Sequence, residues 1–361
     1  MPDLIKIIDW IGEDRTLALG GLLIGALFGL LAQRSQFCLR AAVVEVSRGQ
    51  LGPKLAIWLL AFSAAIIVTQ LLHLGGYFDT VNVRQLSGQG SISGAFIGGA
   101  LFGIGMILAR GCSSRLLVLA ANGNLRALLS GLVFAVVAQA SIGGILSPAR
   151  EAVSAWWPIG GGARDLLSMS ETGHAGGLLF GLAWLFAALF FALRQRVHAW
   201  RWIGSIGVGA TVALAWWFTF AMSSRTFDPT PVKSLSFTSP SADVLMLVLS
   251  PPGQVLNFDL GMVPGVFIGS FLAALLAREL KLEGFQGAYS MPRYILGAIA
   301  MGFGGVLAGG CAVGAGVSGA AIFALTAWIA LAGMWAGASL TDRLIDREPA
   351  IAPNQITGDL P

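Results

Sequence analysis

Three cysteines are the residues of this sequence best placed to do chemistry. Cys38, Cys112 and Cys311 each fall at or beside the start of an apolar stretch too short to cross a membrane. None belongs to a Cys-x-x-Cys pair or a Cys/His metal spacing, so neither a disulfide framework nor a metal site is expected. A single free cysteine is usually a small buried apolar residue. Three at equivalent positions, two of them directly after Gly111 and Gly310, favour a row of functional thiols.

Such a row of thiols suits one kind of ligand. A neutral S–H group is a weak donor and its sulfur a weak acceptor, so it offers soft, easily broken contacts to a ligand that carries sulfur. A short helix beginning at each thiol would also point free N–H groups and its positive dipole end at the ligand, which favours an anion. Conduction needs several weak sites and not one tight site. A small sulfur-containing anion meets all three conditions.

The composition places the elements that carry these thiols in a membrane. Of the 361 residues, 56% are hydrophobic and 11% are charged, whereas a soluble domain carries roughly a quarter charged residues. The 49 glycines and 11 tryptophans suit close helix packing and anchoring at the lipid interface. The net charge of +4 comes without the basic clusters that nucleic-acid binding requires. We expect an all-α polytopic membrane protein in contact with lipid, with no nucleic-acid partner.

The apolar runs predict nine transmembrane helices in a single membrane domain, residues 17–341. Residues 1–16 are expected to lie along the membrane surface and residues 342–361 to form a cytoplasmic tail. Lys and Arg divide 15 to seven between alternate loops, and the richer side is the cytoplasm. The N-terminus is therefore expected outside and the C-terminus inside. The expected spans are 17–33, 55–75, 93–109, 126–146, 175–194, 202–222, 261–280, 294–309 and 323–341.

An internal repeat relates the two halves of the chain. A glycine pattern ending in Leu-Ala-x-Gly-Cys recurs after 199 residues, at the ends of the third and eighth spans. Five crossings separate the copies, so they enter the membrane in opposite directions, which is an inverted repeat. The halves are expected at about 17–146 and 202–341, with the span 175–194 as linker. The two copies are Gly103-x-Gly105-x-x-Leu108-Ala109-x-Gly111-Cys112 and Gly302-x-Gly304-x-x-Leu307-Ala308-x-Gly310-Cys311.

Four short apolar pieces lie between the spans, at 37–46, 112–121, 241–250 and 311–323. They occupy matching places in the two halves, two after spans that end inside and two after spans that end outside. We expect four re-entrant helices; the alternative is that they lie on the surface as connectors. Irregular backbone at membrane depth must be buried or line a cavity, so these pieces are expected to meet at a central constriction.

Other polar residues are expected to support the thiols. Asp243 is expected to cap its own half-helix, with proton coupling as the alternative. Gln36 is a candidate for the inner mouth, with simple packing as the alternative. Ser113 and Ser114 directly follow Cys112 and are expected to assist it.

The whole membrane region, roughly 15–341, resembles the YeeE/YedE family of membrane transporters. The resemblance rests on the Leu-Ala-x-Gly-Cys repeats and on the segments 122–128, 237–243 and 263–269. It implies an hourglass of inverted halves in the bacterial inner membrane, in which the residues matching Cys311, Cys112 and Cys38 hand thiosulfate inward. One departure is Arg110, where the other repeat has Gly309; Arg110 would add an anion contact at the cytoplasmic exit.

The sequence therefore predicts thiosulfate uptake without a chemical reaction, metal or cofactor, and a cytoplasmic sulfur-handling protein is a candidate partner. Three alternatives stay open. A membrane thiol–disulfide oxidoreductase would use the cysteines as redox partners, although no Cys-x-x-Cys pair is present. The substrate could instead be another small sulfur or selenium compound, or a neutral solute whose conduction needs no thiol.

Overall fold

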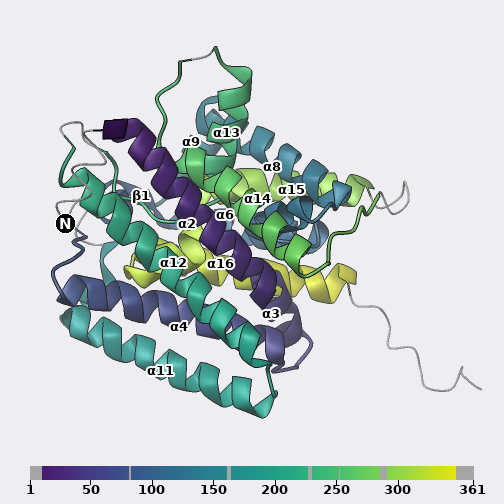
Figure 1. Ribbon diagram of the computed structural model, residues 1–361, viewed down its shortest axis with the longest axis horizontal. Coiled ribbons are helices and arrows are strands. Elements are labelled where there is room, and N and C mark those ends of the chain that lie inside the picture. Colours follow the sequence, from purple (N-terminus) through teal and green to yellow (C-terminus); the bar gives the residue numbers. More distant parts are fainter. Residues whose placement is uncertain are drawn as a thin grey trace, which may run out of the picture.

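The computed structural model describes residues 10–80, 83–160, 164–226, 230–251, 253–284 and 291–346. Every expected span is occupied by a long helix, and the helices form one packed bundle (Figure 1). Seven helical stretches among the described residues are long and apolar enough to cross a membrane. The chain is thus an all-α polytopic membrane protein, while the exact number of crossings stays a prediction. The long helices are α2 (Glu13–Ser35), α4 (Pro53–Leu74), α6 (Ile92–Leu108), α8 (Leu125–Gly143), α11 (Gly173–Arg194), α12 (Ala199–Ser223), α14 (Phe258–Leu276), α15 (Met291–Leu307) and α16 (Leu325–Thr341).

Short helical elements occupy all four places where re-entrant pieces are expected. They are α3 (Leu39–Ser47), α7 (Ser113–Ala121), α13 (Ser239–Leu249) and η3 (Gly314–Gly319). The first three are α-helices, whereas η3 is a π-helix. π-Helices are rare in proteins, and those that occur are often found at functional sites. The turn after α7 has Gly123 at φ 97°, and the turn after η3 has Phe323 at φ 57°. The two elements therefore end in the same way.

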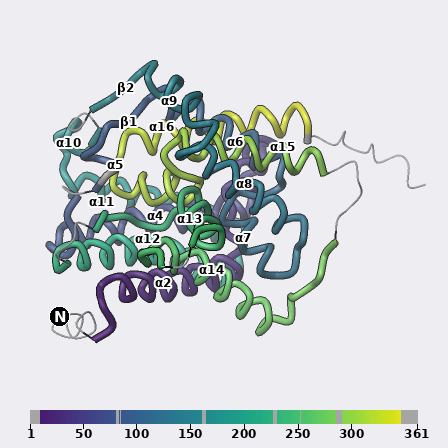
Figure 2. Tube along the Cα trace, turned by 90° about the horizontal axis from the view of Figure 1, so that it is seen from above, coloured from purple at the N-terminus to yellow at the C-terminus, as the bar shows by residue number. Residues whose placement is uncertain are grey.

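Several short elements were not expected from the sequence. They are α5 (Arg84–Ser87), α9 (Ser147–Ser154), α10 (Leu166–Met169) and a two-residue antiparallel ladder of β1 (Gly90–Ser91) with β2 (Pro158–Ile159). Figure 2 shows them gathered on one side of the bundle, at the upper left. They link the loop before α6 to the loop before α11, and both loops are expected outside the membrane.

Glycines let the helix backbones touch. A Cβ atom added at Gly25 of α2 would lie 2.2 Å from the carbonyl oxygen of Met262, and one added at Gly265 of α14 would lie 2.2 Å from that of Leu22. No side chain fits at these distances, so α2 and α14 lie directly against each other (Figure 1). This is the small-residue packing typical of membrane helices.

The same kind of contact joins α6 and α15. A Cβ atom at Gly98 would lie 2.7 Å from the carbonyl oxygen of Gly304, and one at Gly105 would lie 2.5 Å from that of Gly297. These helices end just before Cys112 and Cys311 respectively. Their close crossing therefore fixes the separation of the two elements that carry these thiols.

The helix contacts come in matching sets. If α2, α4, α6 and α8 are matched in order with α12, α14, α15 and α16, each contact has a counterpart. Helix α2 packs on α14 as α12 packs on α4, and α6 packs on α16 as α15 packs on α8. The short elements follow the same rule, because α3 packs on α4 and α13 on α14. Helix α11 stands outside this scheme, packed on α4 at the edge of the bundle (Figure 1).

The ends of the chain are described in part. Residues 1–9 and 347–361, which make up most of the expected surface segment and tail, lie outside the described residues. Asp342, at the start of η4 (Asp342–Asp346), is fully buried. Its carboxylate accepts hydrogen bonds from Arg48 Nη2 at 2.9 Å and from Ser47. This contact fastens the end of α16 to α3.

Candidate functional site

The three cysteines are free thiols in the protein interior. Cys112 and Cys311 are fully buried, and Cys38 is 9% exposed. Cys38 is the N-cap residue of α3 and Cys112 that of α7, while Cys311 lies three residues before η3. Each thiol thus lies at the beginning of a short helical element.

The first turns of α3 and α7 can accept a negative charge. Neither N-cap cysteine makes a side-chain capping bond, and neither first turn holds an acidic residue. The first N–H groups of a helix have no partner within it and carry the positive end of its dipole. Both helix ends can therefore stabilise an anion beside Cys38 and Cys112.

Cys38 and Cys112 form a pair. Their side chains are neighbours. The Sγ atom of Cys112 also lies 3.4 Å from Oγ of Ser114. The guanidinium groups of Arg40 and Arg115 lie within electrostatic range of Cys38. Two thiols, one hydroxyl and two cations are therefore brought together.

Two polar groups beside this pair are buried without a hydrogen-bond partner in the part of the chain that the structure describes. They are Oγ of Ser113, a residue that is 6% exposed, and Nη1 of Arg115. Proteins rarely leave such groups unsatisfied, and each instance calls for an explanation. Both groups can donate to the oxygens of a bound anion.

Cys311 is held by the backbone. Its Sγ atom accepts the N–H of Phe237 at 3.3 Å and the N–H of Gly314 at 3.4 Å. The segment before α13 is tied to η3 by a further bond, from Ser318 Oγ to the carbonyl of Leu235 at 2.8 Å. Because the sulfur already accepts two donors, the S–H group is the part of Cys311 left to contact a ligand, as a donor.

The difference between Arg110 and Gly309 does not alter the backbone. Arg110 has φ 55° and Gly309 has φ 77°, so both residues end their helices in the left-handed conformation. Gly111 N–H then bonds to Met106 at 3.1 Å, and Gly310 N–H bonds to Gly305 at 2.9 Å. The Arg110 side chain is exposed. It is therefore not part of the buried group of thiols.

The two glycines before the cysteines differ in how strictly they are required. A Cβ atom at Gly310 would lie 2.7 Å from the backbone nitrogen of Ala315, whereas one at Gly111 would meet only the side chain of Leu116, at 3.2 Å. Gly310 is thus fixed by close backbone approach.

Gln36 is bonded to a lysine, and Asp243 does not cap its helix. Gln36 is half-buried, and its Oε1 accepts a hydrogen bond from Lys54 Nζ at 2.9 Å. Asp243 was expected to cap its helix, and this is wrong: α13 begins at Ser239 with Thr238 as its N-cap residue. Asp243 is the fifth residue of the helix, beyond the free N–H groups that a cap would satisfy.

Sequence reasoning missed a charged cluster around Lys233. Lys233 forms an ion pair with Asp259, whose side chain is 7% exposed. Asp243 lies within electrostatic range of both residues. Lys233 belongs to the same segment as Phe237, whose N–H reaches Cys311. One feature of the sequence could have drawn attention to Lys233: it is the only lysine between Lys54 and Lys281.

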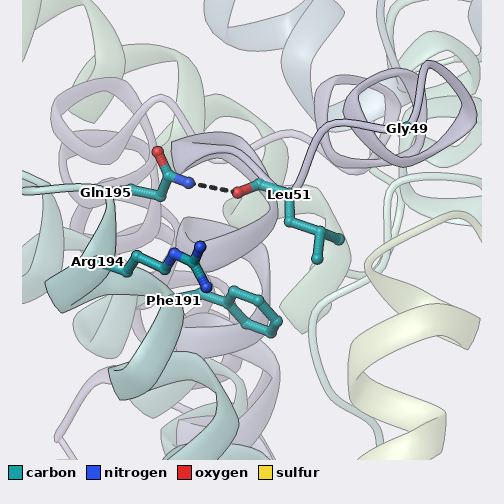
Figure 3. A pocket seen from close by; sticks show the side chains of 5 residues that line it. All are labelled: Gly49, Leu51, Phe191, Arg194 and Gln195. Carbon is teal, nitrogen blue, oxygen red and sulfur yellow. Dashed lines mark hydrogen bonds between the residues drawn. The ribbon is translucent and has the colours of Figure 1, made fainter.

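One surface cavity, of about 290 Å³, lies apart from the thiols. It is formed between the loop before α4 and the end of α11, and Figure 3 shows the hydrogen bond across it from Gln195 Nε2 to the carbonyl of Leu51, at 2.7 Å. Its lining includes Arg194 but no cysteine. The candidate site is therefore the buried set of thiols and not this cavity.

Comparison with known proteins identifies the family. A family model described as sulphur transport matches residues 34–340. The thiosulfate transporter TsuA of Escherichia coli (strain K12) is 24% identical over 342 residues, which are 89% of this chain and 93% of that protein. TsuA of Spirochaeta thermophila is 28% identical over 333 residues, 86% and 93% of the two chains. The probable transporter YedE of Escherichia coli is 41% identical over 92 residues, 24% and 23% of the two chains. Because the family model covers most of its length, this chain belongs to the sulphur transport family and is a membrane transporter, not an enzyme.

Proposed function

We propose that this protein imports thiosulfate across the bacterial inner membrane. The anion would pass from Cys311 near the outside to Cys112 and then to Cys38 near the cytoplasm, through weak S–H contacts and without a chemical reaction. The observation that carries this proposal is the burial of three free thiols, each at the beginning of a short helical element.

The inner thiol pair supports the choice of an anion. The open N-termini of α3 and α7, the guanidinium of Arg115 and the unpartnered Oγ of Ser113 all offer positive charge or hydrogen-bond donors. Each helix end contributes about 0.3–1 kcal/mol, and up to about 2 kcal/mol where it is partly buried. Several contacts of this size bind an anion without trapping it, as conduction requires.

The bonding of Cys311 supports the role of the thiols as donors. Its sulfur accepts two backbone N–H groups, so its S–H can only donate outward. Thiosulfate presents both oxygens and a terminal sulfur to such a donor, whereas sulfate presents oxygens alone. The names of the relatives, both thiosulfate transporters, agree with this substrate.

The matching helix contacts support the proposed inverted halves. Helices α6 and α15 cross through reciprocal glycine contacts, and the other contacts among the eight matched long helices pair off under one correspondence. A pseudo-two-fold axis in the membrane plane would place Cys112 and Cys311 on opposite sides of the crossing.

Uptake of radiolabelled thiosulfate into proteoliposomes tests the proposal. We expect uptake by the wild-type protein, loss of most uptake in Cys112→Ala, and weaker competition by unlabelled sulfate than by unlabelled thiosulfate. Selenate and sulfite as further competitors decide between thiosulfate and the other sulfur or selenium compounds. Equal competition by sulfate would refute the sulfur-specific part of the proposal. Normal uptake by a variant with all three cysteines replaced by alanine would refute the role of the thiols in transport.

A further inference from the structure

The four short helical elements do not all carry a thiol. Cys38 is the N-cap residue of α3, and Thr238 is the N-cap residue of α13. The two positions are 200 residues apart and each follows a phenylalanine, Phe37 or Phe237. Helices α3 and α13 also occupy matching places, since α3 packs on α4 and α16, and α13 packs on α14 and α8. Thr238 thus holds the position that corresponds to Cys38.

Among the described residues, the hydroxyl group of Thr238 is left unbonded. Thr238 is 1% exposed, and its Oγ1 has no hydrogen-bond partner within the described ranges. Threonine at an N-cap position normally accepts a bond from the helix backbone, but no such bond is formed here. A buried hydroxyl without a partner is costly, so its retention calls for a ligand.

The segment that carries this hydroxyl contacts Cys311. Phe237, the preceding residue, donates its N–H to Cys311 Sγ at 3.3 Å. A Cβ atom added at Gly305 would lie 3.0 Å from Thr238 Oγ1, and one added at Gly314 would lie 2.4 Å from Ser236 Oγ. The segment carrying Thr238 is therefore packed between the glycines that flank Cys311 in sequence.

We infer that Thr238 is a fourth binding residue for the transported anion, paired with Cys311 as Cys38 is paired with Cys112. The inference rests on the proposed function and names a residue of the same path. The O–H of Thr238 donates to an oxygen of thiosulfate, while the S–H of Cys311 contacts its terminal sulfur. A hydroxyl is the stronger donor to oxygen, so this pair orients the anion as it enters.

Transport kinetics of Thr238→Val test the inference, because valine keeps the shape of threonine and removes only the hydroxyl. We expect the KM for thiosulfate to rise about tenfold or more, because the variant loses one hydrogen bond to the anion. Thr238→Ser should keep a KM near that of the wild type, and Thr238→Cys should fall between the two. Thr211→Val is the matched control: Thr211 is also 1% exposed, but its hydroxyl bonds to Val208 of its own helix at 2.7 Å.

The unfolding temperature in detergent separates binding from structure. Removing an unpartnered hydroxyl should leave the midpoint of Thr238→Val equal to or above that of the wild type. A normal KM in Thr238→Val, or a lowered midpoint with an unchanged KM, would overturn the inference; Thr238→Ala replaces the valine variant if valine does not fold. Absence of thiosulfate uptake by the wild-type protein would instead refute the proposed function.

Discussion

Replacing Cys311 by alanine should destabilise the protein more than the same change at Cys112. The sulfur of Cys311 accepts two buried backbone N–H groups, from Phe237 and Gly314. Alanine leaves both without an acceptor, and each such loss costs about 1–3 kcal/mol. At Cys112 the sulfur lies beside the thiol of Cys38 and 3.4 Å from the hydroxyl of Ser114. This hydroxyl can rotate toward another acceptor. We therefore expect Cys311→Ala to lose at least about 2 kcal/mol more unfolding free energy than Cys112→Ala.

Thermal unfolding in detergent, followed by tryptophan fluorescence, measures this difference. Cys311→Ser is the decisive control, because its oxygen still accepts the two N–H groups, and it should unfold within about 1 kcal/mol of the wild type. Transport by the three variants is then compared at a temperature where all are folded. Equal midpoints for Cys311→Ala and Cys112→Ala, or a Cys311→Ser midpoint as low as that of Cys311→Ala, would refute this reasoning.

Three further predictions concern packing and topology. Gly265→Ala should lower the unfolding free energy by about 1–3 kcal/mol, since its Cβ would meet a backbone oxygen at 2.2 Å. Gly131→Ala on α8, where a Cβ would have nothing within 4 Å, should raise the unfolding free energy by about 0.5–1 kcal/mol. Equal unfolding midpoints for the two variants would contradict the packing. Asp342→Asn should cost about 1–2 kcal/mol in thermal unfolding, because the ion pair that fastens α16 to α3 loses its charge; a midpoint as high as that of the wild type would show that the pair contributes nothing. A reporter fused after Pro361 should read cytoplasmic and one inserted near Gly160 periplasmic; the same side for both would exclude the proposed inverted halves.

The positions of most helices along the chain were predictable, because a membrane-spanning helix requires a long apolar run of residues. Each of the nine runs contains a helix, and so does each of the four short pieces. The ladder of β1 with β2 was not predictable, because its two strands have two residues each and pair only through tertiary contacts. The helix α13 was placed two residues late. Pro240, a residue typical of the first helical turn, was the missed signal.

The position of the three cysteines at the starts of short helical elements was predictable, and their bonding was not. The starts of the short pieces located Cys38, Cys112 and Cys311, since each apolar piece begins where the polar turn ends. The acceptor role of Cys311 depends on Phe237, which is 74 residues away in sequence. No local pattern records such a contact. For the same reason the ion pair of Lys233 with Asp259 became visible only in three dimensions.

The π-helix η3 has a consequence for how the two proposed halves can diverge. Cys112 and Cys311 are 199 residues apart, but the matching turn residues Gly123 and Phe323 are 200 apart. One extra residue therefore lies between thiol and turn in the second half, and a helix absorbs a single insertion by widening into a π turn. Beyond this point an ungapped alignment of the halves is out of register by one residue. The one-residue shift changes the register but not the packing, because the helices that follow still contact each other in matching ways.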